Sequence, residues 1–148
     1  RYFCRIFCII TSLHRCNESE YRQDGMDLEA VVMGQVLFPI EHPVNLLIIL
    51  ALGHFVADFP LQGDRMAVEK CPGRDVTLNW RWWITAHAAT HGFMVSVLTG
   101  VPLLGLAEMG AHLLIDYGKT RLRYSLFLDQ MMHLICKFVW TGCLFLAV

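Results

Sequence analysis

Four apolar segments run along the chain, and each is long enough to form a helix. They cover residues 44–59, 82–99, 103–117 and 126–148. Within each segment two polar side chains stand four positions apart, and residues with this spacing lie one turn apart on the same face of a helix. The pattern therefore predicts four helices, each with two polar groups on one side.

All of these paired side chains are imidazoles or carboxylates, which are common metal ligands. The pairs are His54 with Asp58, His87 with His91, His112 with Asp116, and Asp129 with His133. Chance placement would give about one such pair in a chain of this length, whereas four are present. For any one pair, a local hydrogen bond or a helix-packing contact is a sufficient explanation. Four pairs in four helices favour a shared site.

The composition suggests that these helices lie in a membrane. Hydrophobic residues make up 55% of the chain and charged residues 17%, with a mean hydropathy of +0.46. Soluble domains have about 25% charged residues. The sequence thus predicts an all-α integral membrane protein whose residues 26–148 form a four-helix transmembrane bundle. The order of the pairs also suggests two repeated helical hairpins.

The distribution of basic residues predicts an orientation for this bundle. Lysines and arginines are concentrated in residues 60–81 and 118–125, and the positive-inside rule places such links in the cytoplasm. All eight paired side chains then lie at a similar depth near the cytoplasmic interface. Residues 1–25 contain four arginines that fit this orientation poorly, so we expect them to be a non-native or disordered extension.

Five imidazoles and three carboxylates are more ligands than one ion needs. The set predicts two divalent ions, or one ion with a second layer of ligands. Zinc is favoured, and manganese or iron would also suit these donors. Any of Asp58, Asp116 and Asp129 could instead serve as a general base for metal-bound water. Lys119 is either an interfacial cation or a group that holds a substrate anion.

Three functions fit such a site. The favoured one is hydrolysis of a lipid or other phosphate ester, because metal ions stabilise phosphoryl displacement and basic links attract anionic head groups. A translocator of divalent metal ions or protons is the alternative, with Glu108 lining the path. A di-iron membrane oxidoreductase is the third. The net charge of −1 gives no reason to expect nucleic-acid binding, and the oligomeric state stays open.

Other polar residues have simpler interpretations. Gln62 and Gln130 are expected to form interhelical hydrogen bonds. Asp64 and Lys70 are expected to be solvated loop charges, and Glu108 is most simply a residue of a helix interface.

The motifs also resemble those of a known family. They are GHFVADFPLQ (53–62), Lys70, HAATH (87–91), HLLIDYGK (112–119) and FLDQMMH (127–133). In this order they resemble a bacterial and phage membrane-protein family designated domain of unknown function 3307, over residues 46–140. The designation implies no activity. More distantly, the His-x-x-x-Asp helices look like those of membrane-bound, metal-dependent hydrolases, and this likeness implies a bacterial inner-membrane location.

Overall fold

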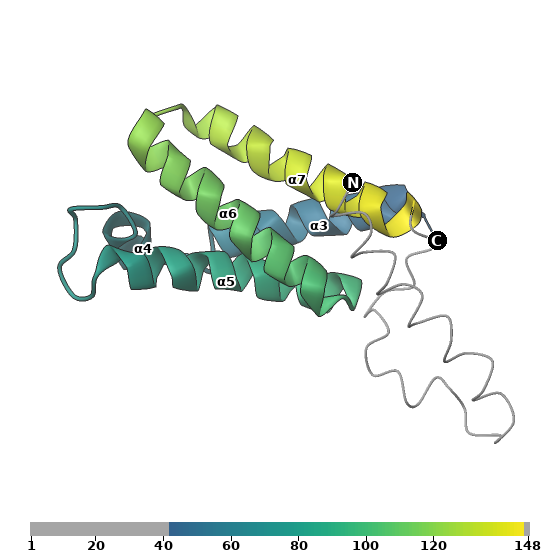
Figure 1. The fold of residues 1–148 in the computed structure, drawn as a ribbon, viewed down its shortest axis with the longest axis horizontal. Coiled ribbons are helices and arrows are strands. Elements are labelled where there is room, and N and C mark those ends of the chain that lie inside the picture. The colour runs from purple at the N-terminus through teal and green to yellow at the C-terminus, as the bar shows by residue number, and fades with distance from the viewer. Residues whose placement is uncertain (1–41, 147–148) are drawn as a thin grey trace, which may run out of the picture.

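The computed structural model describes residues 42–146, and the regular structure in that range is helical. The helices, in chain order, are α3 (Pro43–Asp58), α4 (Asp64–Glu69), α5 (Trp80–Thr99), α6 (Pro102–Leu122) and α7 (Leu126–Leu146) (Figure 1). The four long helices coincide with the four apolar segments, except that α6 continues to Leu122, into the residues 118–125 that were expected to form a basic link. The short helix α4 interrupts the stretch that was expected to be only a polar connection. Residues 1–25, expected to be an extension, lie outside the described residues.

Local sequence explains where the long helices begin and end. Pro43 and Pro102 stand in the first turns of α3 and α6, where a missing backbone N–H costs nothing and the fixed φ suits a helix. Asn79 precedes α5, and its side chain accepts a hydrogen bond of 3.1 Å from the backbone N–H of Arg81. Helix α5 ends at Gly100, whose φ of 68° is a conformation that favours glycine.

The four long helices form a closed ring of contacts. Helix α3 packs against α5 and α7, and α6 packs against the same two helices. The closest pair is α5 with α6, because glycines face each other there. A Cβ atom on Gly105 would lie 2.3 Å from the carbonyl oxygen of Gly92 and 1.8 Å from Oγ of Ser96. The absence of a side chain therefore lets these two backbones approach closely.

The interior of this ring changes character along its length. The end that contains the first turns of α3 and the last turns of α5 is apolar. Its buried core consists of Leu46, Leu50, Val95, Leu98, Leu104 and Trp140. Burying one leucine side chain contributes about 1.5–3 kcal/mol, so this end supplies apolar stabilisation. The opposite end, where α3 ends and α7 begins, is filled by polar side chains.

The prediction of a transmembrane bundle is wrong. Among residues 42–146, no helix combines the length and the hydropathy that crossing a bilayer requires. Helix α3 has 16 residues, whereas a span needs about 20, and the longer helices carry ionisable side chains on their inward faces. Large apolar side chains lie instead on outer faces, as Phe93, Phe127 and Phe138 do at 70%, 76% and 67% exposure. The orientation expected for the basic links presupposes spanning helices and stays untested.

Candidate metal centre

The structure brings all eight paired side chains together inside the polar end of the bundle. Each of the eight residues is at most 8% exposed. The i, i+4 spacing places two of them on the inward face of each long helix, and the ring of helices directs the four faces at one another. Seven of them fall into two adjacent groups, which we call the imidazole group and the carboxylate group, and His54 lies between the two.

The imidazole group consists of Asp58, His87, His91 and His112, whose donor atoms all lie within 4.8 Å of one another. Asp58 Oδ1 is 3.2 Å from His87 Nε2 and 3.7 Å from His91 Nε2. The Nε2 atoms of His87 and His112 are 3.1 Å apart, and the rings of His91 and His112 stack with centroids 3.6 Å apart. Three nitrogens and one oxygen are a donor set that suits tetrahedral zinc.

The carboxylate group consists of Asp116, Asp129 and His133, again with donor atoms within 4.8 Å of one another. His133 Nε2 is 3.3 Å from Asp116 Oδ1 and 3.8 Å from Asp129 Oδ1. This group has two oxygens and one nitrogen. It could therefore hold a second divalent ion that keeps open positions for water or substrate.

Asp116 connects the two groups. Its Oδ1 faces His133, whereas its Oδ2 lies 3.5 Å from His87 Nε2. A carboxylate placed in this way is suited to bridge two ions. His54 also lies between the groups, where its donor atoms are within 4.8 Å of those of His112 and His133.

Three of the buried histidines, His54, His91 and His112, are held in the form that binds metal ions. Burial lowers the pKa of His54 from 6.5 to about 3. Burial likewise lowers the pKa of His91 to about 4 and that of His112 to about 2. A histidine with such a pKa is neutral at pH 7, so a ring nitrogen keeps a lone pair for an ion.

Two of the carboxylates, Asp58 and Asp116, are held in the ionised form. Burial by itself would raise the pKa of Asp116, but its hydrogen bond with His133 and the charge of Lys70 outweigh that effect and lower it. Burial would also raise the pKa of Asp58, but the nearby imidazoles of His87 and His91 and the hydrogen bond from Gln130 outweigh that effect and lower it. The interior thus combines negative charge with neutral imidazoles, as a cation site requires.

Unpartnered atoms support the same interpretation. Six ring nitrogens and carboxylate oxygens of these side chains are buried without a hydrogen-bond partner among the described residues, and they include His91 Nε2 and Asp129 Oδ1. A buried polar atom left in this way costs about 1–3 kcal/mol. A divalent cation within the groups would use both lone pairs, so the residues present fit a metal ion.

Gln130 supports the imidazole group from the side. Its Nε2 donates a hydrogen bond of 2.5 Å to Asp58 Oδ2, and its Oε1 lies 3.2 Å from His54 Nε2. Gln130 lies on α7 and both of its partners lie on α3. The expectation of an interhelical hydrogen bond at Gln130 is therefore confirmed. Gln62 behaves differently, because it accepts a hydrogen bond from Lys70, eight residues further along the chain.

A buried ion pair lies on the apolar side of the imidazole and carboxylate groups. Lys137 and Trp140 both donate hydrogen bonds to the carboxylate of Glu108. The same carboxylate lies 3.6 Å from Nδ1 of His112, so it can orient that ring. Sequence reasoning treated Glu108 as an interface residue and overlooked Lys137. The four-residue spacing continues to both residues, because Glu108 lies four positions before His112 and Lys137 lies four positions after His133.

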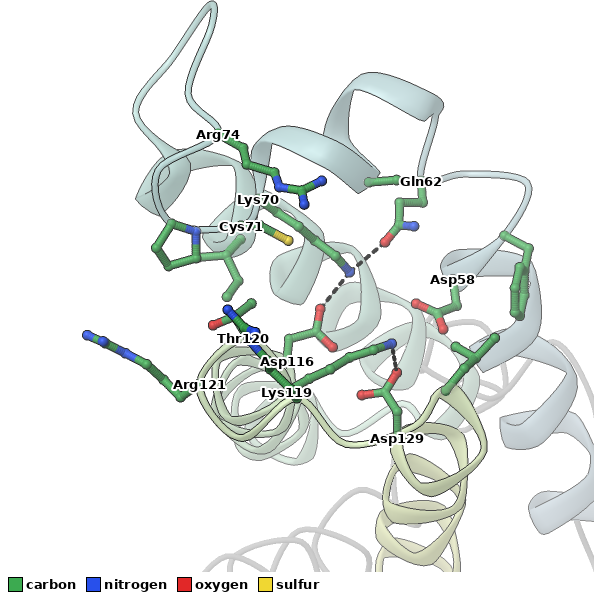
Figure 2. A pocket seen from close by; sticks show the side chains of 16 residues that line it. Asp58, Gln62, Lys70, Cys71, Arg74, Asp116, Lys119, Thr120, Arg121 and Asp129 are labelled. Atoms are coloured by element: carbon green, nitrogen blue, oxygen red, sulfur yellow. Dashed lines mark hydrogen bonds and ion pairs between the residues drawn. The ribbon is translucent and has the colours of Figure 1, made fainter.

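A pocket of about 750 Å³ opens directly over the three aspartates (Figure 2). Asp58, Asp116 and Asp129 form part of its lining. Cationic side chains from the α4 region and from the end of α6 line it as well: Lys70, Arg74, Lys119, Arg121 and Arg123. Cations outnumber carboxylates in this lining, so the pocket favours an anionic ligand above a cation-binding floor.

Two lysines connect the pocket to its floor. Lys119 Nζ donates a hydrogen bond of 2.6 Å to Asp129 Oδ2. Lys70 Nζ donates hydrogen bonds of 2.6 Å to Asp116 Oδ2 and to Gln62 Oε1. Lys70 was expected to be a solvated loop charge, and this expectation is wrong. No local spacing indicated the contact, because Asp116 lies 46 residues away along the chain.

The segment that carries Lys70 is anchored by its neighbour Glu69, which is 3% exposed. The Glu69 carboxylate accepts hydrogen bonds of 2.8 Å from the backbone N–H of Thr77 and 3.1 Å from Nε1 of Trp83. These bonds tie the end of α4 to the following loop and to α5. Lys70 is therefore positioned by the fold.

A family model described as "Protein of unknown function (DUF3307)" matches residues 46–146. The chain belongs to the DUF3307 family. The match confirms the family resemblance of the sequence motifs, and it covers the imidazole group, the carboxylate group and both lysines of this DUF3307 chain. No curated protein and no solved structure matches it. The more distant resemblance to metal-dependent hydrolases therefore has no counterpart in the comparisons.

Proposed function

We propose that this DUF3307 chain is a metal-dependent hydrolase that acts on a phosphate ester, of a lipid or of another molecule. One observation carries the proposal: a buried set of imidazoles and carboxylates forms the floor of a pocket with cationic walls. Such a floor suits a divalent cation, and such walls suit the anionic group that the cation would act on.

The two groups favour two ions. The imidazole group would hold one ion, for which its nitrogen-rich donors favour zinc. The carboxylate group would hold the other, with Asp116 between them. Two divalent ions about 3.5–4 Å apart activate a water molecule and stabilise the charge that develops on a transferring phosphoryl group. Two ions therefore explain why the interior holds eight donors.

The chain's own residues would supply the remaining parts of the reaction. The side chain of Asp58 is 11% exposed, compared with 5% for Asp116 and 3% for Asp129. It is thus the carboxylate best placed to accept a proton from a water molecule in the pocket. Gln130 would hold Asp58 in orientation, and Lys119 would bind an oxygen of the phosphoryl group.

The buried ion pair favours an enzyme over a translocator. Lys137, Glu108 and Trp140 fill the interior beyond the metal-binding groups, and the apolar core lies beyond them. A cation leaving the site in this direction would have to pass a buried ammonium group. A hydrolase needs only the pocket side to be open.

Elemental analysis and phosphate release test the proposal together. We expect the purified full chain to carry zinc, and to release phosphate from at least one member of a panel of small and lipid phosphate esters. His112→Ala should lower the rate more than about 100-fold, because ligand loss is at least as severe as loss of a group that orients a ligand. His42→Ala is the matched control, since His42 is exposed outside the site and makes no side-chain cap.

Activity that survives His112→Ala unchanged would refute the assigned site. Iron in place of zinc, together with oxidase activity and no phosphate release, would support the di-iron alternative.

A further inference from the structure

Asp116 and Asp129 each use their two oxygens for different purposes. In Asp116, Oδ1 is 3.3 Å from His133 Nε2, whereas Oδ2 accepts the hydrogen bond from Lys70 and also lies 3.5 Å from His87 Nε2. In Asp129, Oδ1 faces the same imidazole nitrogen at 3.8 Å, whereas Oδ2 accepts the hydrogen bond from Lys119. In both residues one oxygen faces His133, and the other oxygen accepts a hydrogen bond from a lysine ammonium group.

Both ammonium groups retain donors for a ligand in the pocket. A lysine ammonium has three N–H donors. Lys70 uses two of them, on Asp116 and Gln62, and Lys119 uses one, on Asp129. Both side chains line the pocket and remain partly accessible, at 16% and 35% exposure. Figure 2 shows them reaching across the aspartates from different elements of the fold.

We propose that Lys70 and Lys119 form a binding site for a terminal phosphate group, built on the outer oxygens of the two aspartates that bind metal. The inference rests on the proposed function, because the same aspartates must bind the ion through their inner oxygens. Arg74 lines the pocket near Lys70 and makes no ion pair with a described residue. It would add a third positive charge for a doubly charged anion.

The shared carboxylates couple the two sites. An ion held by Asp116 or Asp129 would draw electron density from that carboxylate, and the hydrogen bond that the carboxylate accepts from the lysine would weaken. The ammonium charge then becomes more available to the phosphate. By reciprocity, phosphate must strengthen metal binding by the same factor. Metal ion and phosphate therefore bind cooperatively.

Calorimetric titration of inorganic phosphate into the full chain, with and without zinc, tests this inference. We expect zinc to raise phosphate affinity at least tenfold. Lys70→Met and Lys119→Met should each lower phosphate affinity at least tenfold in the presence of zinc, while zinc affinity stays within threefold or increases. Arg65→Met is the matched control, because Arg65 carries the same charge on α4 and does not line the pocket.

The outcomes separate this inference from the proposed function. If the wild-type chain binds no zinc, the proposed function and the coupling both fail. If zinc binds but either lysine variant keeps its phosphate affinity within twofold, or zinc leaves phosphate affinity unchanged, the inference fails and the metal site stands. Lys70→Arg and Lys119→Arg retain the charge and should keep most of the affinity, which guards against a folding defect.

A second experiment identifies the source of the phosphate group. Vesicles of phosphatidylcholine with and without phosphatidic acid are compared in sedimentation with the zinc-loaded chain. Binding that requires phosphatidic acid and Lys119 assigns the site to a lipid head group. Phosphate binding in calorimetry without such sedimentation assigns it to a free phosphate ester. Binding of neither anion overturns the inference.

Discussion

Lys137 and Glu108 form an ion pair inside the bundle, with only 1% and 0% of the two residues exposed. The pair joins α7 to α6, and Trp140 adds a hydrogen bond of 2.5 Å to the same carboxylate. It separates the imidazole and carboxylate groups from the apolar core. Buried charges of this kind are compensated only by each other.

Removing one member of this pair should therefore destabilise the fold. We expect Lys137→Met to lower the free energy of unfolding by about 3–5 kcal/mol, because the Glu108 carboxylate would be left buried and uncompensated. Urea unfolding followed by circular dichroism measures the change. The double variant Lys137→Met/Glu108→Gln should lose less than Lys137→Met alone. A double variant that loses the sum of the two single changes would refute the compensation.

Metal binding should depend on Asp116 more than on any other carboxylate. Because Asp116 lies between the two groups, Asp116→Asn should reduce zinc at both. Asp129→Asn should reduce zinc only at the carboxylate group. Elemental analysis of zinc per chain after dialysis distinguishes the two variants. Asp64→Asn, at an exposed position of α4, should retain the wild-type content. Equal zinc contents in all three variants would contradict the bridging arrangement.

Stability should fall as the pH decreases below 6.5. The folded pKa values of His54, His91 and His112 are lowered to about 3, about 4 and about 2. Between pH 6.5 and about 4 the unfolded chain therefore binds protons that the folded chain does not, so acid favours unfolding. Each histidine contributes up to about 1.4 kcal/mol per pH unit. The depressed carboxylate pKa values act only at lower pH, where unfolded aspartates begin to protonate.

Urea unfolding at a series of pH values, with a chelator present, measures this slope. His91→Gln should reduce the slope by the contribution of one proton, whatever its effect on stability at pH 7. A free energy of unfolding that stays constant between pH 7 and pH 5 would show that these imidazoles do not remain neutral in the fold.

The contact between α5 and α6 should not tolerate a side chain at Gly105. A Cβ atom there would lie 1.8 Å from Oγ of Ser96 and 2.3 Å from the backbone oxygen of Gly92. We expect Gly105→Ala to lower the free energy of unfolding by at least about 2 kcal/mol through overpacking. Thermal unfolding followed by circular dichroism measures the effect.

Gly110 is the matched control for this substitution. It lies on the same helix, and a Cβ atom there would meet nothing within 4 Å. Gly110→Ala should stabilise the fold by about 0.4–1 kcal/mol, because alanine restricts the unfolded chain. Similar effects of the two substitutions would mean that the helices are not as close as the structure places them.

Much of the candidate centre could be predicted from the sequence because its ligands are paired within single helices. Spacing of four residues places both members of a pair, such as His112 and Asp116, on one face whatever the helix packs against. The positions of the four long helices were readable for the same reason, since apolar runs and flanking prolines are local signals. The family resemblance, which a family model bears out over residues 46–146, depended on the same motifs.

The expectation of a transmembrane bundle failed because mean hydropathy does not distinguish inward from outward positions. Apolar residues such as Phe93 and Phe138 lie on outer faces. The inward faces, by contrast, carry imidazoles, carboxylates and Lys137. Only the arrangement of the helices separates these two sets.

By itself, the sequence determined the four long helices, the pairs on their faces and the family, because each is encoded within one segment. Only the tertiary structure decided that Lys70 reaches Asp116 across 46 residues, that Asp116 lies between two groups, and that Lys137 meets Glu108. These contacts join side chains from different elements. Their existence depends on how the helices pack, and no spacing within a single segment specifies that packing.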